Sequence, residues 1–247
     1  MKSYAKINIY LKITGARGDY HELSSRFVKF YPLYDELEFE PSQNFEIKSN
    51  INIQGNIILK ALDILKQSGY KNELDEYFKS HKIILTKRIP MGAGLGGGSS
   101  NAATFLRLAN EKLNLKINTH DLAKIGAKIG SDVSFFVYDY NSADVSGIGE
   151  IVNEFDDNVP QLQIFTPEIF CDTPSVYKQF RSNFMHKIDV NLAKKLSKMK
   201  SDEILATFNQ DALNDLYAPC ISLYPKISEY KDMFLSGSGS TLFKVKK

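Results

Sequence analysis

The chain has 247 residues, of which 43% are hydrophobic and 24% are charged, and its formal net charge is +2. This length allows one large domain or two small ones. The balance of acidic and basic residues gives no support for a dedicated binder of nucleic acid or acidic membranes. Cys171 and Cys220 lie far apart and outside any CxxC pattern, which indicates neither a zinc site nor a disulfide framework. Because the chain also lacks a signal-peptide pattern and a membrane-spanning apolar run, we expect a reduced, cytoplasmic protein.

Strands predominate among the elements predicted for the first half of the chain. Residues 4–13 alternate polar and apolar side chains, which is typical of a strand with one apolar face. The other predicted strands are residues 25–40, with an edge or break at Pro32, and residues 44–48, 51–54, 82–89 and 132–138. Helical spacing predicts a helix from Asn56 to Gly69, a helix over residues 102–113 and a helix that ends at Gly130.

Helices predominate after residues 153–161, a polar and turn-rich segment that contains Pro160. They are predicted over residues 173–180, 190–199, 201–208 and 211–219. A strand-rich first half and a helix-rich second half predict an α+β protein with two lobes.

Five glycines lie between Gly92 and Gly98, in the stretch PMGAGLGGGSSNA, with a predicted strand before it and a predicted helix after it. Glycines let an anion approach the backbone, and the dipole of the following helix favours negative charge. Ser99 and Ser100 add hydroxyls that suit a helix cap, a phosphate or Mg²⁺. The alternative, a flexible linker, fits the flanking strand and helix less well. The loop is therefore a candidate phosphate-binding site.

Three known phosphate motifs fail in this loop. A Walker A loop requires lysine after its last glycine, but Ser99 follows Gly98. The pattern G-x-G-x-x-G is present at Gly92, Gly94 and Gly97, but a dinucleotide-binding unit needs a second strand after the helix, and here a second helix is predicted. The H-R-D and D-F-G elements of protein kinases are absent from the sequence.

The longer form P-x-G-A-G-L-G-G-G-S-S resembles the phosphate loop of the GHMP kinases, the superfamily of galactokinase, homoserine, mevalonate and phosphomevalonate kinases. Other stretches narrow this resemblance to the branch that phosphorylates a cytidine diphosphate conjugate of methylerythritol. They are AKINIYLKITG (5–15), YHEL (20–23), IGSDVSFFV (129–137), GIGE (147–150) and LSGSGSTLF (235–243). The matches follow the order of the family and cover nearly the whole chain.

The resemblance implies an α+β, two-domain GHMP kinase fold. Its domains would be residues 1–156, similar to ribosomal protein S5 domain 2, and residues 157–247, ferredoxin-like and apparently shortened because seven residues follow SGSGS. The implied activity is phosphorylation of the 2-hydroxyl of the substrate by ATP and Mg²⁺, on the methylerythritol phosphate route to isoprenoid precursors. The implied partner is this small molecule alone, with no nucleic acid and no membrane, and the protein would be a monomer or a weak homodimer.

The resemblance also assigns residues. Asp132 would be the catalytic base, since phosphoryl transfer needs a group that accepts the proton of the attacking hydroxyl, and Lys6 would stabilise its carboxylate. The positions implied for ATP are Pro90, Met91, Gly92, Ala93, Gly94, Leu95, Gly96, Gly97, Gly98, Ser99, Ser100, Asn56 and Lys87. The positions implied for substrate are Asn8, Tyr20, His21, Tyr177, Gly237 and Ser238, with the two tyrosines and the histidine around cytosine. Ser99 and Ser100 are candidate Mg²⁺ contacts, and the ligand set stays unknown.

Each assignment has a plainer alternative. Asp132 suits a turn or helix cap, Lys6 a solvated strand position, Asn56 a helix cap and Lys87 a strand end. Two departures from the family also stand out: the turn before Tyr20 is one residue short, and serine replaces a usual proline two residues after Asp132. Alternative functions are a homoserine or mevalonate type of kinase, an NAD-binding oxidoreductase and a non-catalytic binding protein.

Overall fold

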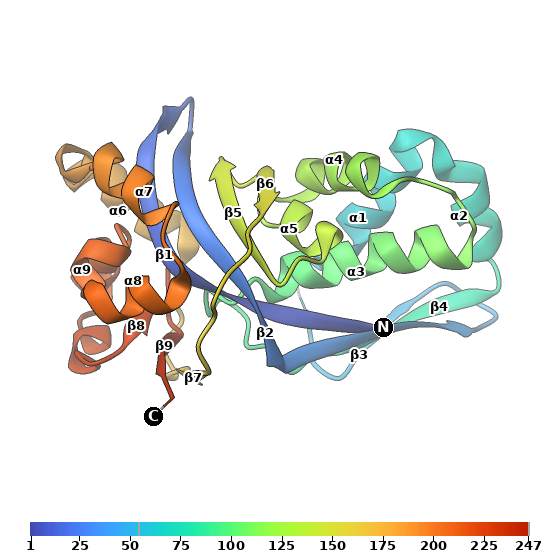
Figure 1. The fold of residues 1–247 in the computed structure, drawn as a ribbon. Helices are drawn as coiled ribbons and strands as arrows, with labels where there is room; N and C mark the ends of the chain where they lie inside the picture. Colours follow the sequence, from blue (N-terminus) through green and yellow to red (C-terminus); the bar gives the residue numbers. More distant parts are fainter. Residues whose placement is uncertain (54, 247) are drawn as a thin grey trace. The chain divides into compact units, whose positions relative to one another are not determined.

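The computed structural model describes residues 1–53 and 55–246, drawn as a ribbon in Figure 1. They form two compact units, each assembled from separate stretches of the chain. The first unit comprises Met1–Ala5, Phe30–Ile89 and Gly96–Asp139, and the second comprises Lys6–Lys29, Pro90–Leu95 and Tyr140–Lys247. These units are discontinuous in sequence, and the division into domains at residue 156 stays a prediction.

The first unit combines a sheet with helices that cover one of its faces (Figure 1). Strand β3 (Ile47–Ser49) is parallel to β4 (His81–Thr86), and β4 is antiparallel to the end of β2 (Tyr20–Pro41). The helices are α1 (Ile57–Leu65), α2 (Lys71–Tyr77), α3 (Gly97–Lys112), α4 (Thr119–Ile129) and α5 (Val133–Tyr138). The antiparallel pair rules out the parallel sheet that the NAD-binding alternative requires.

Aromatic side chains join the sheet of the first unit to its helices. The Phe39 ring on β2 lies 5.1 Å from that of Phe78 and 5.8 Å from that of Phe105 on α3, measured between ring centroids. Such pairs stabilise beyond the area they bury. The fully buried aliphatic side chains around them include Leu37, Ile58, Ala61, Leu65, Ile83 and Leu106.

The strands of the second unit belong to the six-stranded sheet and to a three-stranded sheet. Strand β1 (Lys2–Arg17) pairs with β2, the start of β2 is antiparallel to β5 (Ser142–Gly147), and β5 is antiparallel to β6 (Ile151–Glu154). The second sheet has the antiparallel order β7 (Leu162–Phe165), β9 (Leu242–Val245) and β8 (Phe234–Leu235) among the described residues. The helices are α6 (Thr173–Asn183), α7 (Val190–Leu196), α8 (Ser201–Thr207), α9 (Gln210–Leu213) and α10 (Tyr217–Leu223). The reduced size of the second domain stays a prediction.

The prediction of a strand over residues 132–138 is wrong. Helix α5 covers Val133–Tyr138, and its residues from Val133 to Val137 are all buried. An apolar run that is buried on every side shows neither the twofold nor the helical period, so periodicity could not separate the two structures.

Three further predicted elements differ from the structure, and the possible break at Pro32 does not occur. Residues 51–53 form no strand, and residue 54, the end of that predicted strand, lies outside the described residues. Gly69 does not end the helical segment: its φ of 106° produces a kink over Lys66–Tyr70, and α2 follows. Residues 211–219 form parts of α9 and α10, since α9 ends at Leu213. The strand through Pro32 is not broken, because β2 continues to Pro41.

The polar side of β1 is buried rather than solvated. Lys6, Asn8, Tyr10 and Lys12 are each at most 4% exposed, like the apolar residues that alternate with them. Each of the four has polar partners: Lys12, for example, forms a buried ion pair with Asp215. Burying such groups without partners is unfavourable, so this polar row depends on contacts made by distant parts of the chain.

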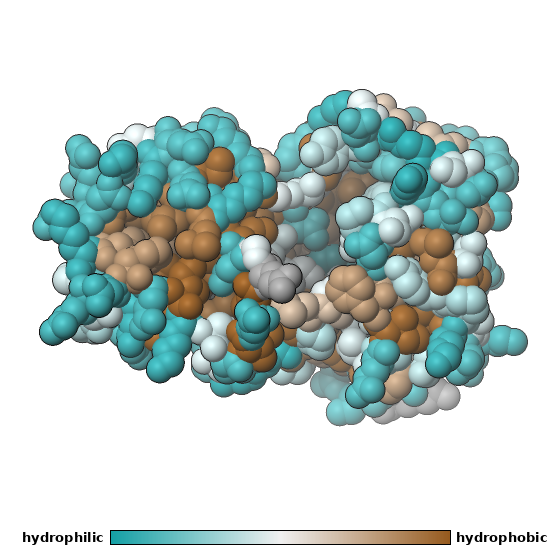
Figure 2. All heavy atoms as spheres, turned by 180° about the vertical axis from the view of Figure 1, so that it is seen from behind, coloured by the Kyte–Doolittle hydropathy of each residue, from teal (hydrophilic) through white to brown (hydrophobic). Residues whose placement is uncertain are grey.

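The face drawn in Figure 2 is mainly hydrophilic, and hydrophobic side chains gather in patches between the polar ones. The most exposed large hydrophobic side chains are Phe170, Tyr20, Met91 and Tyr31. No helix formed by residues 1–53 and 55–246 has the length and apolar character needed to cross a bilayer.

Candidate active site

The first half of the glycine loop, Pro90–Leu95, lies against the second glycine motif, residues 235–240. A Cβ at Gly94 would stand 2.2 Å from the Ser236 carbonyl oxygen and 3.0 Å from that of Gly239, and the φ of Gly94 is +73°. The Thr241 N–H donates to the Ala93 carbonyl at 3.1 Å. Gly94 is therefore glycine because another backbone lies against it.

Gly92 has a similar role. Its φ is +66°, and a Cβ there would lie 2.4 Å from Cε2 of Phe170, whose side chain is 67% exposed. Pro90 and Met91 are exposed, whereas Ala93 and Leu95 are buried. Packing thus explains the glycines of this half of the loop, and a phosphate is not needed to account for them.

The second half of the loop begins helix α3. Gly96 precedes the helix with a φ of +68°, and Gly97 packs tightly, since a Cβ would lie 2.8 Å from Cγ2 of Ile89. Gly98 differs, because its nearest neighbour would be Cγ2 of Ile57 at 3.8 Å, an ordinary contact. The backbone at Gly98 is exposed, and the first-turn amides of a long helix attract anions. This exposed first turn is the part of the loop that leaves room for an anion.

Ser99 and Ser100 have different environments. Ser100 is 1% exposed and its Oγ accepts a hydrogen bond from Ser3 Oγ at 2.9 Å, whereas Ser99 is partly exposed. Ser99 is thus the hydroxyl better placed to meet a ligand. Among residues 1–53 and 55–246, no group of three or more histidine, cysteine and acidic side chains could hold a metal ion. Mg²⁺ usually binds through substrate phosphates and few protein groups, which fits a single hydroxyl of this kind.

Lys87 lies in a buried network that the sequence did not reveal. Its Nζ donates to Asp35 Oδ2 at 2.5 Å and to Asn101 Oδ1 at 3.1 Å. Asp35 is fully buried and also accepts from the backbone N–H groups of Arg88 and Ile89 at 2.6 and 2.8 Å. The network ties the end of β4 to helix α3. The ammonium of Lys87 therefore has protein partners of its own.

One sequence signal could have identified Asp35. In β2 the side chains of residues 35, 37 and 39 share a face, because strand side chains alternate. Asp35 is thus in phase with Leu37 and Phe39, while the glutamates at 36, 38 and 40 occupy the other face. An aspartate on an apolar face indicates a buried and paired carboxylate.

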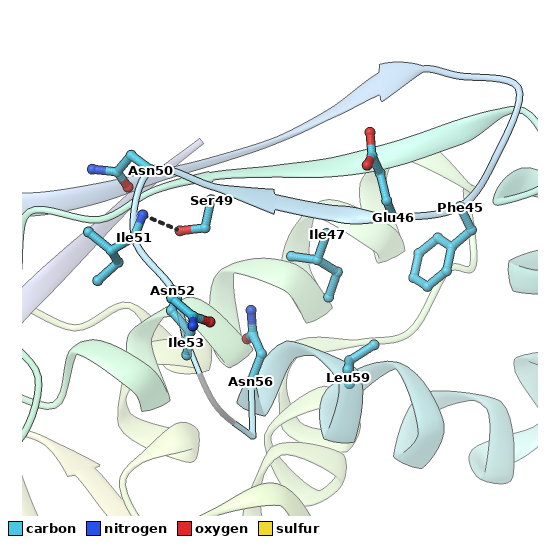
Figure 3. Close-up of a pocket in the computed structure, with 10 residues that line it drawn as sticks. All are labelled: Phe45, Glu46, Ile47, Ser49, Asn50, Ile51, Asn52, Ile53, Asn56 and Leu59. Carbon is cyan, nitrogen blue, oxygen red and sulfur yellow. Dashed lines mark hydrogen bonds between the residues drawn. The ribbon is translucent and has the colours of Figure 1, made fainter.

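Asn56 caps α1 and also lines a cavity. Its Oδ1 accepts from the Ile58 N–H at 3.0 Å, which confirms the predicted cap. The cavity has a volume of about 600 Å³, within the range of small-molecule pockets. Figure 3 shows Ile47, Asn52 and Leu59 around it, on β3, the following segment and α1. Five of the ten lining residues are apolar and five are polar, three of them asparagines, a mixture that suits a planar heterocycle.

Lys6 and Asn8 form a buried pair on β1. Lys6 Nζ donates to Asn8 Oδ1 at 2.5 Å and to the Gly94 carbonyl at 3.0 Å, and it lies 4.7 Å from the centre of the Phe27 ring. Asn8 Nδ2 in turn donates to Ser25 Oγ at 2.9 Å. The structure thus joins the predicted catalytic lysine to the glycine loop, in place of the solvated lysine of the alternative interpretation.

Asp132 lies at the turn between α4 and α5. It is the residue directly before α5 and has a φ of −83° and a ψ of −6°. Its side chain makes no capping hydrogen bond to that helix. The turn is closed by the Val133 N–H, which donates to the Gly130 carbonyl at 3.1 Å. Capping therefore does not explain an aspartate here.

His21 and Tyr177, from distant parts of the sequence, lie side by side. Their ring centroids are 5.3 Å apart, and the Phe180 ring lies 5.8 Å from that of His21. His21 is 7% exposed, and its Nε2 has no hydrogen-bond partner. Burial, and then the charge of Arg181, lower the pKa of His21. Tyr20 is 61% exposed, and its carbonyl accepts from Arg181 Nη2 at 3.0 Å. A buried imidazole nitrogen without a partner points to a ligand.

Gly237 and Ser238 belong to the second glycine motif. Gly237 has a φ of +60°, and its carbonyl accepts from Asn214 Nδ2 at 2.9 Å. Ser238 is 5% exposed and shares a hydrogen bond of 2.7 Å with Thr173 Oγ1. Asn214, which the sequence did not single out, therefore holds this motif in place.

The two cysteines meet in the second unit despite their separation in the sequence. Cys171 and Cys220 are free and buried, and their Sγ atoms are 3.8 Å apart. A Cβ added at Gly239 would lie 3.1 Å from the Sγ of Cys220 and 3.3 Å from the Sγ of Cys171. The thiols thus serve as packing for the second glycine motif.

These features define a class of protein. Residues 56–140 match the GHMP kinases N terminal domain. The whole chain is similar to a crystal structure of 4-(cytidine 5'-diphospho)-2C-methyl-D-erythritol kinase, with a TM-score of 0.74, 26% identity and coverage of 100% of this chain and 90% of the other. The fold is therefore that of the GHMP kinases, and the protein is an ATP-dependent small-molecule kinase.

Closer relatives narrow the class. The chain is 46% identical to the 4-diphosphocytidyl-2-C-methyl-D-erythritol kinase of Campylobacter jejuni subsp. doylei, and the match covers 99% of each chain. It is 43% identical to the enzyme of the same name from Sulfurimonas denitrificans, over 100% of this chain and 96% of the relative. The chain belongs to the 4-diphosphocytidyl-2-C-methyl-D-erythritol kinase family. The predicted α+β fold and family are confirmed, and the oxidoreductase alternative is wrong.

Proposed function

We propose that this protein transfers the γ-phosphoryl group of ATP to the 2-hydroxyl of 4-diphosphocytidyl-2-C-methyl-D-erythritol, on the methylerythritol phosphate route to isoprenoid precursors. The observation that carries this proposal is the buried, unpartnered Nε2 of His21 beside the Tyr177 ring. A cytosine ring offers both a face for stacking and an edge for hydrogen bonding. Homoserine and mevalonate have neither, so they would leave this nitrogen without a partner.

ATP binding is supported by two features of the first unit. The open backbone at Gly98 and the first turn of α3 suit the phosphates, and the cavity beside Asn56 suits the adenine ring. The remaining loop residues would hold these groups in place. The ammonium of Lys87 is bound by Asp35 and Asn101. Lys87 would therefore support ATP binding indirectly, because these bonds fix the end of β4 next to the loop.

The chemistry is assigned to Asp132 and Lys6. The carboxylate of Asp132 would accept the proton of the 2-hydroxyl. The oxygen of that hydroxyl would at the same time bond to the γ-phosphorus of ATP, and ADP would leave. The ammonium of Lys6 would stabilise negative charge that develops during this transfer. Mg²⁺, held by the phosphates of ATP and by the hydroxyl of Ser99, would neutralise part of their charge. Asn8, Tyr20, Gly237 and Ser238 complete the proposed substrate contacts, and the enzyme would act in the cytoplasm on this small molecule alone.

The proposal is tested by a substrate panel. Purified protein would be given ATP and Mg²⁺ with the cytidine conjugate, homoserine or mevalonate, and ADP release would be followed. We expect turnover with the cytidine conjugate only. Turnover of homoserine or mevalonate without turnover of the cytidine conjugate would refute the substrate assignment, and ATP binding without any turnover would favour a binding protein.

Gly98→Ala is expected to weaken ATP binding without loss of stability. A Cβ at Gly98 meets only ordinary contacts in the protein, and alanine is better than glycine in a helix by about 1 kcal/mol. The methyl group would, however, occupy the space of a phosphate, so we expect KM for ATP to rise about 10-fold, a cost of roughly 1.4 kcal/mol. Steady-state kinetics and thermal unfolding measure the two effects. An unchanged KM for ATP would place the phosphates elsewhere.

His21→Phe is expected to weaken substrate binding and to raise stability slightly. Phenylalanine keeps ring contacts with Tyr177 and Phe180 and removes a buried nitrogen that lacks a partner. We expect KM for the cytidine conjugate to rise about 10-fold or more, with KM for ATP unchanged as the internal control. Because burial favours neutral His21, KM of the unmodified enzyme should also rise as pH falls through the range in which His21 protonates. A variant with a lower Tm and an unchanged KM would assign His21 to packing.

A further inference from the structure

Ser236, the first serine of the second glycine motif, has a hydroxyl that joins three segments of the chain. The residue is fully buried. Its Oγ donates to the Gly94 carbonyl at 3.2 Å and accepts from the Asn8 N–H at 3.2 Å. A serine hydroxyl has one proton, so donation to Gly94 uses its whole donor capacity.

The Gly94 carbonyl has a second donor, Lys6 Nζ, at 3.0 Å. A carbonyl oxygen has two lone pairs, and the hydroxyl of Ser236 and the ammonium of Lys6 occupy both. Lys6 Nζ also donates to Asn8 Oδ1 at 2.5 Å. Ser236 therefore contacts two residues that bind the lysine ammonium: the carbonyl of Gly94 and the backbone N–H of Asn8.

The backbone around Ser236 leaves its hydroxyl little freedom. Asn214 Nδ2 donates to the carbonyls of Leu235 and Gly237, both at 2.9 Å, and so holds the residues on either side of Ser236. A Cβ at Gly237 would lie 3.2 Å from the Gly94 carbonyl oxygen. The motif thus approaches the same oxygen from its backbone and from its side chain.

We propose that Ser236 is a positioning residue for phosphoryl transfer, which holds the Lys6 ammonium in place through the Gly94 carbonyl and the Asn8 backbone. The proposal rests on the role of Lys6 in the proposed function. A long lysine side chain has many rotamers, and a catalytic charge acts best when it is already in place before the reaction. The loss of the hydroxyl should therefore lower kcat more than it changes either KM.

The test is a double-mutant cycle with Ser236→Ala and Lys6→Met, measured by single-turnover phosphorylation of the cytidine conjugate. We expect Ser236→Ala to lower the rate about 10-fold, and Lys6→Met to lower it about 100-fold or more. In the Lys6→Met background, Ser236→Ala should have almost no further effect, because no ammonium remains to be positioned. A full 10-fold loss in both backgrounds would overturn the proposal and assign Ser236 to general stability.

Two controls keep the outcomes separate. Ser142→Ala removes another buried serine hydroxyl of the second unit, which donates to Asp157 Oδ2 at 2.7 Å, and it should leave the rate unchanged. Should Ser236→Ala fail to fold, Ser236→Cys fills the same volume with a weaker hydrogen-bonding group and should give an intermediate rate. If Lys6→Met alone kept the full rate, the roles of Lys6 and Ser236 would both be wrong, while turnover by the unmodified enzyme would still support the proposed function.

Discussion

Asp132→Asn is expected to lower kcat about 1,000-fold, within the usual contribution of a positioned general base. Asparagine has nearly the same shape as aspartate but cannot accept the proton of the attacking hydroxyl. The Asp132 side chain does not cap α5, so this substitution should leave that helix intact. KM for ATP should also stay the same, because the contacts proposed for the phosphates and the adenine ring lie at α3 and in the cavity beside Asn56.

The measurement is steady-state ADP release, with circular dichroism and thermal unfolding on the same samples. Asp139→Asn is the matched control: it changes the aspartate at the other end of α5, which pairs with Arg107 at 3.0 Å. Asparagine tolerates the left-handed backbone found there, with a φ of 62°, so kcat should change little. Full kcat in Asp132→Asn would rule out proton transfer to this carboxylate but leave the family assignment intact.

Asp35→Ala is expected to lower the free energy of unfolding by about 3–5 kcal/mol, the usual cost of removing one partner of a buried ion pair. Both groups of the pair are buried, with side-chain exposures of 0% for Asp35 and 5% for Lys87. Without Asp35, the ammonium would be left in the interior with Asn101, and two backbone N–H groups would lose their acceptor. Because the network joins β4 to α3, the phosphate loop between them should also loosen.

Urea denaturation measures this loss. Asp75→Ala is the control, since Asp75 pairs with Lys66 and Lys71 at the surface, and exposed pairs contribute little. The double variant Asp35→Ala with Lys87→Met should recover part of the stability, because it leaves no unpaired charge. If Asp35→Ala and Asp75→Ala lowered the free energy of unfolding equally, burial of the Asp35–Lys87 pair would not be the cause of the loss.

Local sequence predicted much of the secondary structure and the kind of site. The alternation in residues 4–13, the Asn56 cap and the stop at Gly130 are local signals, and the structure confirms them. The glycine cluster between a strand and a helix indicated a phosphate-binding loop, because it rests on the conformational freedom of glycine and on helix termini, both of which are properties of neighbouring residues.

The tertiary structure decided what each residue does. Gly94 and Gly98 are the same residue type in one loop, yet a Cβ at Gly94 would clash with the Ser236 carbonyl, whereas a Cβ at Gly98 would meet only an ordinary contact with Ile57. The resemblance assigned Lys87 to ATP, but in the structure its ammonium binds Asp35, which is 52 residues away in the sequence. His21 meets Tyr177 through the packing of the second unit. These contacts join segments far apart in the chain, so no local period, cap or motif specifies them. They arise because buried polar groups must find partners wherever the fold places them.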